Sequence, residues 1–379
     1  MKIGILAFGP LGAGGVYQYN RSIIDALKRD KKKSYIVFCD KEENIYDNCG
    51  LEVRKITIPK TNLIKKFIRV AQFLFLIRKS WFFTKNEISE FLDIDLFLSP
   101  QVLPYPHFFL NKPFVFTLHD MQERYYPENF TKYENFVRWI INRALSKSSD
   151  KIICESNFVK KDIVKFIGID DAKIDIIQSP PPEVFLNFKF EEKKFNKVRK
   201  KYNLPENYIF YPANCWTHKN HIKLVEAFEI VSKQFDNVYL ILTGSQINNY
   251  KNLKKRIEEL NLNNKVKHLG YIDYEDLSYL YKMSKFLVMP TLFESVSIPI
   301  YEAFALEVAV CSSNTVALPE QVGDAAIIFN PNDVYDIAQK MMMYLKDNNL
   351  RNEKAKLGLA RVKFFDHENY KIKLLKALN

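Results

Sequence analysis

The chain has 379 residues, of which 47% are hydrophobic and 26% charged, and its 56 basic and 44 acidic side chains give a net charge of +12. This length favours two domains, and the composition excludes a collagen or a long disordered tract while allowing a core that needs no disulfide or metal staple. No apolar stretch reaches the roughly 20 residues that span a bilayer. The charge therefore points to nucleic acid, an anionic membrane surface or anionic small substrates, or only to a lysine-rich proteome.

The beginning of the chain differs from a signal peptide, because the apolar segment 2–8 ends at Gly9 and Pro10 without a small-residue cleavage site. The five cysteines form no CxxC pair and are odd in number. We therefore expect a cytoplasmic protein with reduced, buried thiols.

The first half of the chain alternates short apolar segments with segments of helical period. The apolar segments are 2–8, 35–39, 51–58, 96–99, 114–118, 151–154 and 173–177, and the helical ones include 16–28, 135–145 and 158–166. Apolar segments of this length suit parallel strands that are buried on both faces. Their alternation with helices predicts a doubly wound α/β sheet.

Within this half, the segment 60–85 contains no acidic residue and concentrates positive charge. At about 100° per residue, Lys65, Arg69 and Lys79 fall roughly opposite an apolar stripe. That stripe consists of Leu63, Phe67, Val70, Leu74, Ile77 and Trp81. Two interpretations stay open, namely a buried helix with a basic outer face and a helix that rests on an anionic membrane leaflet.

Two features of this half follow predicted strands, where α/β folds collect functional residues. Gly14 and Gly15 end a glycine-rich loop after the first strand, and glycine lets the backbone approach a phosphate closely. The loop is not a clean GxGxxG, so a dehydrogenase is not supported. His119, followed by Asp120, ends the strand at 114–118 and is either a donor to a sugar hydroxyl or a structural loop histidine.

The pattern breaks at the three prolines 180–182, which lack N–H groups and hold their predecessors extended. A second series of strands is predicted at 208–212, 238–243, 266–270, 286–289, 308–312 and 326–329. We predict an N-terminal Rossmann-like domain over 1–185, a C-terminal one over 186–355, and a helix over 356–379 that packs back on the first domain. A ligand cleft is expected where the carboxyl ends of the strands meet.

The segment 286–302 carries the strongest chemical signal. Ser297 is a good N-cap after the predicted strand, with Pro299 in the first helical turn. The unpaired N–H groups of that helix would form an anion site at the mouth of the strand. Glu294 and Glu302 flank it, and two carboxylates suit a ligand that also carries hydroxyls, such as a ribose or a hexose. A capped helix with two solvated acids is the other interpretation.

Three motifs of the second half together resemble the retaining GT-B glycosyltransferases of family 4. The pair Glu294 and Glu302 fits the E-x7-E motif of that family. The sequence LPEQVGDAA at 318–326 and the loop YPANCWTHKN at 211–220 resemble two further motifs. The similarity covers most of the chain and is strongest over 208–332. It implies an α/β GT-B fold, with two Rossmann-like domains facing across a cleft, and a nucleotide-sugar donor that is bound without a cofactor or a metal ion.

The resemblance implies a role for each matching residue. Glu294 would contact the hydroxyls of the donor sugar, Glu302 those of the ribose, and Lys219 the diphosphate, whose charge grows as it leaves. Together with His119, which resembles the family histidine near the sugar, Glu294 and Lys219 are the predicted catalytic residues. The predicted nucleotide-sugar ligands are Gly14, Gly15, Asn214, Lys219, Ile272, Glu294, Ser297, Ile298 and Glu302.

The chain departs from the family at two of these positions. Many relatives have arginine at Asn214, and glycine commonly stands at Ser297. We expect the Asn214 amide or His218 to replace the missing phosphate contact, and the Ser297 N–H and hydroxyl to serve as donors. Ile272 would pair the nucleobase through its backbone, which leaves the base itself open.

The resemblance implies a hexosyltransferase for a glycan or lipid-linked acceptor in bacterial surface polysaccharide assembly, such as O-antigen or capsule, with GDP-mannose as the favoured donor. No nucleic-acid-binding module is recognisable, so that partner is not expected. The membrane interpretation of 60–85 would make the protein peripheral on the inner face of the plasma membrane. Two other functions stay open, namely a non-catalytic GT-B-like partner protein and a nucleotide-sugar epimerase or phosphorylase of GT-B shape.

Overall fold

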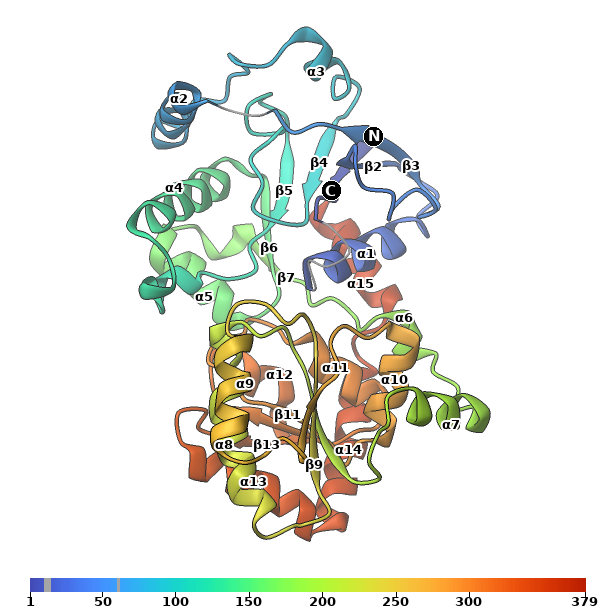
Figure 1. Ribbon diagram of the computed structural model, residues 1–379. Helices are drawn as coiled ribbons and strands as arrows, with labels where there is room; N and C mark the ends of the chain where they lie inside the picture. The colour runs from blue at the N-terminus through green and yellow to red at the C-terminus, as the bar shows by residue number, and fades with distance from the viewer. Residues whose placement is uncertain (10–14, 60–61) are drawn as a thin grey trace. The chain divides into compact units, whose positions relative to one another are not determined.

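The computed structural model describes residues 1–9, 15–59 and 62–379. These residues form two compact units, one comprising Met1–Ser179 with Asp366–Asn379 and the other Pro180–Phe365. Each unit is built around one parallel sheet (Figure 1).

The first unit contains a seven-stranded sheet of order β3-β2-β1-β4-β5-β6-β7, in which all neighbouring strands pair in parallel. Its strands are β1 (Lys2–Leu6), β2 (Ser34–Asp40), β3 (Glu52–Ile56), β4 (Leu96–Ser99), β5 (Phe114–Thr117), β6 (Lys151–Cys154) and β7 (Ile174–Ile176). The order reverses between β1 and β4, and the carboxyl ends of strands at such a reversal are where open α/β sheets bind ligands.

Helices cover both faces of this sheet (Figure 1). They are α1 (Gly15–Leu27), α2 (Leu63–Leu74), α3 (Lys85–Ser89), α4 (Lys132–Ser148), α5 (Asn157–Ile167) and α15 (His367–Ala377). On one face α15 packs against α1, and Tyr370 and Leu374 join Ile23 and Ile24 in one buried cluster. On the other face α2 and α5 both contact α4. The last helix of the chain therefore completes the core of the first unit.

The second unit contains a six-stranded sheet of order β10-β9-β8-β11-β12-β13, again with all neighbouring strands parallel. Its strands are β8 (Tyr208–Pro212), β9 (Tyr239–Thr243), β10 (Val266–His268), β11 (Phe286–Met289), β12 (Val310–Ser313) and β13 (Ala326–Phe329). Here the order reverses between β8 and β11.

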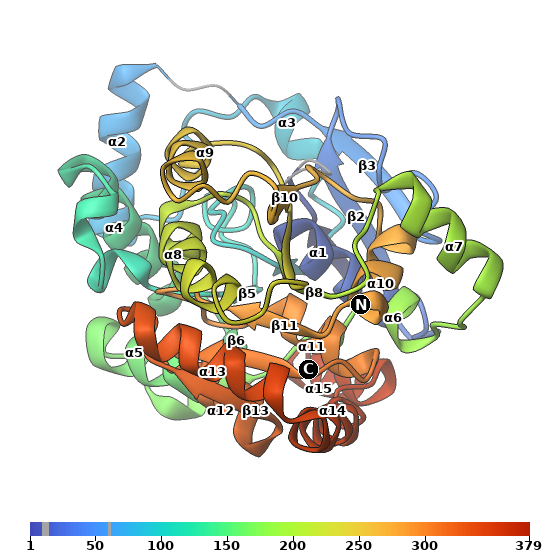
Figure 2. The same cartoon turned by 60° about the horizontal axis from the view of Figure 1, so that its bottom comes forward.

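The helices of the second unit also lie on two sides of its sheet. They are α6 (Glu183–Leu186), α7 (Glu192–Lys201), α8 (His221–Ser232), α9 (Tyr250–Glu259), α10 (Tyr274–Met283), α11 (Ile298–Ala305), α12 (Leu318–Val322), α13 (Val334–Lys346) and α14 (Asn348–Val362). Helix α8 packs beside α13 and α9, while α11 packs beside α14 (Figure 2). The doubly wound α/β class predicted from the sequence is therefore confirmed in both units.

The predicted C-terminal helix is two helices that belong to different units. Helix α14 stays with the second unit, because Arg361 donates to the carbonyl oxygens of Glu320 and Gln321, both at 2.7 Å. The side chain of Asp366 then accepts from the Asn369 N–H at 2.7 Å and caps a new helix, α15. The first unit accordingly takes its last segment from Asp366 onward, and its earlier part ends at Ser179, directly before the prolines.

The structure differs from the interpretation of 60–85 as a helix whose apolar stripe is buried. The side chains of Leu63 and Phe67 are exposed, at 72% and 70% of their residue areas. The inner face instead contains Phe73 and Arg69, whose guanidinium lies 5.2 Å from the ring centroids of Phe83 and Phe109. Cation–π packing lets a basic residue take a core-facing position. Of the apolar stripe, Val70 still packs against the core, while Leu63 and Phe67 are left toward the solvent. The helix also ends at Leu74, well before residue 85.

Two expectations from composition can be compared with the described residues. All five cysteines are buried, and none of them forms a disulfide. Among the residues that the structure describes, no helix combines the length and the apolar character needed to cross a membrane.

Candidate functional site

The candidate site lies in the second unit, where the strand order reverses between β8 and β11. The loop that follows β8 carries Asn214 and Lys219, and the loop that follows β11 carries Glu294 and Ser297. Carboxyl ends of neighbouring parallel strands meet at one edge of a sheet, so residues about 80 positions apart in the sequence become neighbours there.

Backbone and side-chain hydrogen bonds hold these two loops together. The Leu292 N–H donates to the carbonyl oxygen of His218 at 2.7 Å, and the Thr291 hydroxyl donates to the same oxygen at 3.1 Å. The buried Asn220 side chain donates to the carbonyl oxygens of Pro290 and Pro331, at 3.0 and 2.9 Å. Sequence reasoning gave Asn220 no role; its backbone φ of +59° is one that asparagine tolerates better than most residues. The loops are thus fixed relative to each other.

Lys219 and Glu294, two of the predicted catalytic residues, form an ion pair across this junction. Their side chains are 19% and 18% exposed, so the pair is shielded but reachable. The backbone of Lys219 is held by the Tyr211 hydroxyl, which donates to its carbonyl oxygen at 2.8 Å. Each charge is compensated by the other before any ligand binds, and an incoming diphosphate would compete with Glu294 for the ammonium group.

Close backbone approach fixes the first of these loops against β9. Gly244 follows β9 with φ +122°, and a Cβ placed on it would lie 2.5 Å from the carbonyl oxygen of Ala213. Next to it, the Ser245 N–H donates to Oδ1 of Asn214 at 2.7 Å. Only glycine therefore allows the loop that carries Lys219 to lie where it does.

Replacement of Gly244 by alanine should lower the free energy of unfolding by about 3 kcal/mol, because it adds overpacking to an unfavourable φ. Gly168→Ala is the matched control: that glycine has φ +74°, and a Cβ added to it would meet nothing within 4 Å, so only about 1 kcal/mol is expected. Denaturant unfolding of both variants measures the difference. Equal losses would contradict the close approach at Gly244.

Glu302 lies deeper than the pair, on the first turns of α11. Its residue area is 3% exposed, and the hydroxyl of the buried Tyr281 donates to its Oε2 at 2.6 Å. Burial raises the pKa of Glu302 to about 7, while the hydrogen bond from Tyr281 lowers it in part. The sequence alone did not indicate this burial, because a glutamate at this spacing is equally compatible with a solvated helix face.

The raised pKa of Glu302 makes stability depend on pH. Because the folded-state pKa lies above the unfolded one, its stabilisation is present below about pH 4.3 and is lost as the pH rises through about 7. We expect wild type to lose roughly 3 kcal/mol over this range relative to Glu302→Gln. Urea unfolding at several pH values measures it, with the exposed Glu258→Gln as a control that should follow wild type. Parallel wild-type and Glu302→Gln curves would contradict the assignment.

Ser297 occupies the N-cap position of α11, but the predicted side-chain cap is wrong. Its hydroxyl makes no capping hydrogen bond and lies 3.9 Å from the sulfur of Met289. The amide of Gln321 bonds both its backbone groups, accepting from the N–H at 2.8 Å and donating to the carbonyl at 2.7 Å. The Ser297 N–H is therefore already used, and the N–H of Ile298, the first residue of α11, is the next one that could meet an anion.

His218 does not supply the positive charge that an arginine at position 214 would bring. Burial, helped by the charge of Lys219, lowers the pKa of His218 to about 4, so the imidazole is neutral near pH 7. Oδ1 of Asn214 accepts from Ser245, which leaves its amide nitrogen as the donor side. Ile272 is buried in the segment between β10 and α10, next to an exposed Tyr271.

In the first unit, His119 follows β5 at the carboxyl edge of the sheet. Its Nδ1 lies 3.0 Å from Oε2 of Glu155, and its Nε2 lies 2.8 Å from the carbonyl oxygen of Pro100. Gly15 is the exposed first residue of α1. Gly14 lies outside the described residues, as does the rest of the glycine-rich loop at 10–14.

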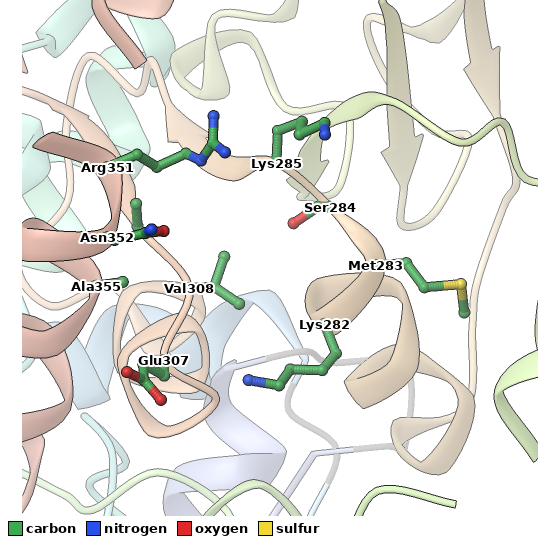
Figure 3. A pocket seen from close by; sticks show the side chains of 10 residues that line it. Lys282, Met283, Ser284, Lys285, Glu307, Val308, Arg351, Asn352 and Ala355 are labelled. Carbon is green, nitrogen blue, oxygen red and sulfur yellow. The ribbon is translucent and has the colours of Figure 1, made fainter. Parts of the chain in front are cut away.

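A pocket of about 270 Å³ lies at the opposite edge of the second sheet, before β11 and β12 (Figure 3). Two of its three basic residues, Lys282 and Arg351, are used within the fold. Lys282 Nζ donates to the Leu306 carbonyl, and Arg351 donates to the Tyr344 carbonyl, both at 2.7 Å. Cationic side chains that bond the last carbonyl groups of helices stabilise those helix ends. We therefore assign ligand binding to the carboxyl edge of the sheet and not to this pocket.

The carboxyl edge of the second sheet therefore combines one lysine, an accessible carboxylate, a buried carboxylate and a helix N-terminus. Such a set binds a ligand that has both an anionic part and hydroxyl groups. Among the described ranges, no three His, Cys, Asp or Glu side chains are grouped to hold a metal ion.

Two family models match the chain in succession. The model described as Glycosyltransferase Family 4 matches residues 13–180, and the model described as Glycosyl transferases group 1 matches residues 192–358. The interval between them contains the prolines at which the second unit begins.

Curated relatives with similar sequences are mannosyltransferases by name. O-antigen chain mannosyltransferase B of Escherichia coli is 29% identical over 273 residues, which are 67% of this chain and 67% of that protein. O-antigen chain mannosyltransferase RfbU of Salmonella typhimurium is 23% identical over 334 residues, covering 88% of this chain and 87% of the relative. WbdA of Escherichia coli is 25% identical over 255 residues, but the matched part is only 31% of its length.

Solved structures share the fold over the whole chain. Sucrose-phosphate synthase from Thermosynechococcus elongatus gives a TM-score of 0.79 at 18% identity, covering 99% of this chain and 98% of that one. Anabaena HepE in complex with UDP and glucose gives 0.78 at 18% identity, covering 100% and 99%. At such identities the likeness establishes the architecture alone.

Proposed function

Because the chain is a GT-B glycosyltransferase of the family 4 type, we propose that it transfers mannose from GDP-mannose to a glycan or lipid-linked acceptor in the assembly of bacterial O-antigen. The ion pair of Lys219 and Glu294 at the reversal between β8 and β11 is the observation that carries this proposal. The names of the relatives, O-antigen mannosyltransferases, support the sugar and the process.

In this proposal the second unit binds the donor. Lys219 and the N-terminus of α11 neutralise the diphosphate, Glu294 accepts from the sugar hydroxyls, and Glu302 accepts from the ribose. The bond from the anomeric carbon to the phosphate oxygen breaks, the acceptor oxygen bonds to that carbon from the same face, and the acceptor proton passes to the departing phosphate. Configuration is then retained without an enzymic nucleophile. No metal ion is required in this scheme, and turnover in the presence of EDTA tests that part.

A donor screen tests the function. The purified full chain is incubated with GDP-mannose, UDP-glucose and a dTDP-sugar, with and without a lipid-linked oligosaccharide, and nucleotide release is measured. We expect GDP-mannose to be turned over at least tenfold faster than the others. Turnover of UDP-glucose alone would overturn GDP-mannose as the donor. If the chain neither binds nor turns over any nucleotide sugar, that result favours the non-catalytic partner protein.

The proposal places the enzyme in the cytoplasm and includes a peripheral membrane contact through α2. Its outer face carries the exposed Leu63, Ile64 and Phe67, and Phe75 follows the helix with 75% of its area exposed. The segment has no acidic residue, and its exposed Lys66, Lys79 and Lys85 match an anionic leaflet. Helix α2 lies beside α4 (Figure 1, Figure 2). The apolar side chains of Leu63, Ile64 and Phe67 stay exposed.

Vesicle binding checks the membrane contact. Leu63→Ser with Phe67→Ser should weaken binding to phosphatidylglycerol vesicles at least tenfold, because two large side chains no longer enter the lipid. Phe73 is unsuitable for this test because it is buried. Tyr335→Ser, which changes an exposed aromatic residue of the second unit, is the control and should bind like wild type. Unchanged binding of the double variant in flotation assays would exclude α2 as the contact.

A further inference from the structure

A buried carboxylate of the first unit has no part in the function proposed above. Glu155 follows β6 and is 5% exposed. Its Oε2 lies 3.0 Å from Nδ1 of His119, and its Oε1 accepts from the Ser179 hydroxyl at 2.9 Å and from the Ser179 N–H at 3.4 Å. Both carboxylate oxygens are therefore occupied, and the side chain is held at two points, one of them the last residue before the prolines.

The second nitrogen of His119 determines the protonation of the ring. Nε2 lies 2.8 Å from the carbonyl oxygen of Pro100, and a carbonyl can only accept, so Nε2 carries a proton. Nδ1 faces a carboxylate, which also accepts when ionised. When Glu155 is ionised, both contacts are satisfied together only by a ring that has two N–H groups and a positive charge.

The other groups around His119 agree with a charged ring. Tyr19 presents its ring edge-on at 4.6 Å between centroids, and burial raises the pKa of its phenol far above the usual value, so it stays neutral. Asp120, the next residue, is negative and has Arg138 at 3.5 Å. Burial alone would lower the pKa of His119, but the hydrogen bond and charge of Glu155, then the Pro100 carbonyl and Asp120, raise it above the ordinary histidine value.

We propose that Glu155 is a positioning residue that fixes His119 as an imidazolium, so that His119 contributes a fixed positive charge rather than a hydrogen-bond donor to the substrate. Both N–H groups are spent on Glu155 and Pro100, and the 25% of the side chain that is exposed is left for an anionic ligand to approach. The role of that charge in catalysis rests on the proposed function; the protonation state itself does not. A charge held in place in advance stabilises an anion at no reorganisation cost.

The protonation state can be measured without any activity. In the full chain labelled with ¹⁵N-histidine, the His119 signals, assigned by their loss in His119→Gln, should show both ring nitrogens protonated at pH 7.5. Glu155→Gln keeps the size of the side chain and should lower the titration midpoint by about one pH unit or more. Ser179→Ala leaves the carboxylate in place and should shift the midpoint less. A neutral ring in wild type, or an unchanged midpoint in folded Glu155→Gln, overturns the proposal.

The pH dependence of activity gives a second measurement, which a purely structural role of Glu155 would leave unchanged. One pH unit corresponds to a tenfold change in the protonated fraction above the midpoint. Glu155→Gln should therefore be impaired about tenfold more at pH 8.5 than at pH 6, whereas a structural defect lowers the rate equally at both. Absence of any glycosyltransferase turnover would refute the proposed function and leave the nitrogen signals of His119 to decide the protonation.

Discussion

Lys219→Met is expected to lower kcat/KM for the donor by 10²- to 10³-fold, the largest effect of any single change that keeps the fold. The ammonium group is the cation placed beside Glu294 at the junction of the β8 and β11 loops. In the proposed function, removing it takes away the charge that meets the departing diphosphate, an interaction that strengthens in the transition state. It also leaves the partly buried Glu294 carboxylate without its partner, which further disfavours an anionic ligand.

Lys223→Met is the matched control for this change. Lys223 lies one turn further along, in α8, where its Nζ donates to the Asn332 carbonyl at 2.7 Å. The Lys223→Met substitution removes the same charge from the same unit, and the kcat/KM of this variant should stay within about twofold of wild type. Steady-state kinetics with the donor found in the screen compare the two. Equal losses would mean that net charge, and not the position of Lys219, matters for turnover.

Glu294→Gln is expected to lower kcat about 10²-fold with a smaller change in KM. The amide keeps the shape of the side chain but accepts more weakly, and it turns one acceptor position into a donor that opposes the sugar hydroxyls. The change also frees Lys219 from its ion pair. Binding of the bare nucleoside diphosphate should therefore be retained or tightened, which isothermal titration measures independently of the chemistry.

The double variant of Lys219→Met and Glu294→Gln tests whether the pair acts as a unit. Groups in direct contact are not additive, so the double variant should lose less than the product of the two single losses. Glu307→Gln, an exposed glutamate just past α11, serves as the control and should retain wild-type kcat. Strict additivity, or unchanged nucleotide affinity in both single variants, would show that the ion pair plays no part in donor binding.

The strands could be predicted because parallel strands covered on both faces must be apolar along their length. The predicted bounds of β4, β6, β8, β11 and β13 are those of the structure. Charged and polar residues directly after such strands belong to the ligand edge by topology. The resemblance to the family assigned Lys219 and Glu294 to one donor site, but their contact was not predicted. The family models, which match residues 13–180 and 192–358, agree with the predicted fold class.

Side-chain contacts between distant segments could not be predicted from the sequence in this way. A period of 3.6 residues located the apolar stripe of α2, but it does not say which face meets the core, and Arg69 takes the inner position on two rings. The sequence pattern of a glutamate one turn into a helix is the same whether its side chain is solvated or buried. Only the contact with the Tyr281 hydroxyl in the structure shows that Glu302 is buried. Likewise, Gln321 uses the Ser297 N–H from 24 residues away.

The sequence by itself therefore determined the doubly wound class, the break at the prolines and the edge of each sheet where a ligand is expected, because these follow from local apolar patterning and chain order. The tertiary structure decided which charges are paired, buried or exposed: Lys219 with Glu294, Glu302 with Tyr281, and His119 between Glu155 and Pro100. Those states depend on solvent exclusion and on partners far away in the chain. The net charge of +12 does not distinguish basic side chains that the fold pairs, such as Lys219, from exposed ones, such as Lys66 in α2 and Lys79 after it.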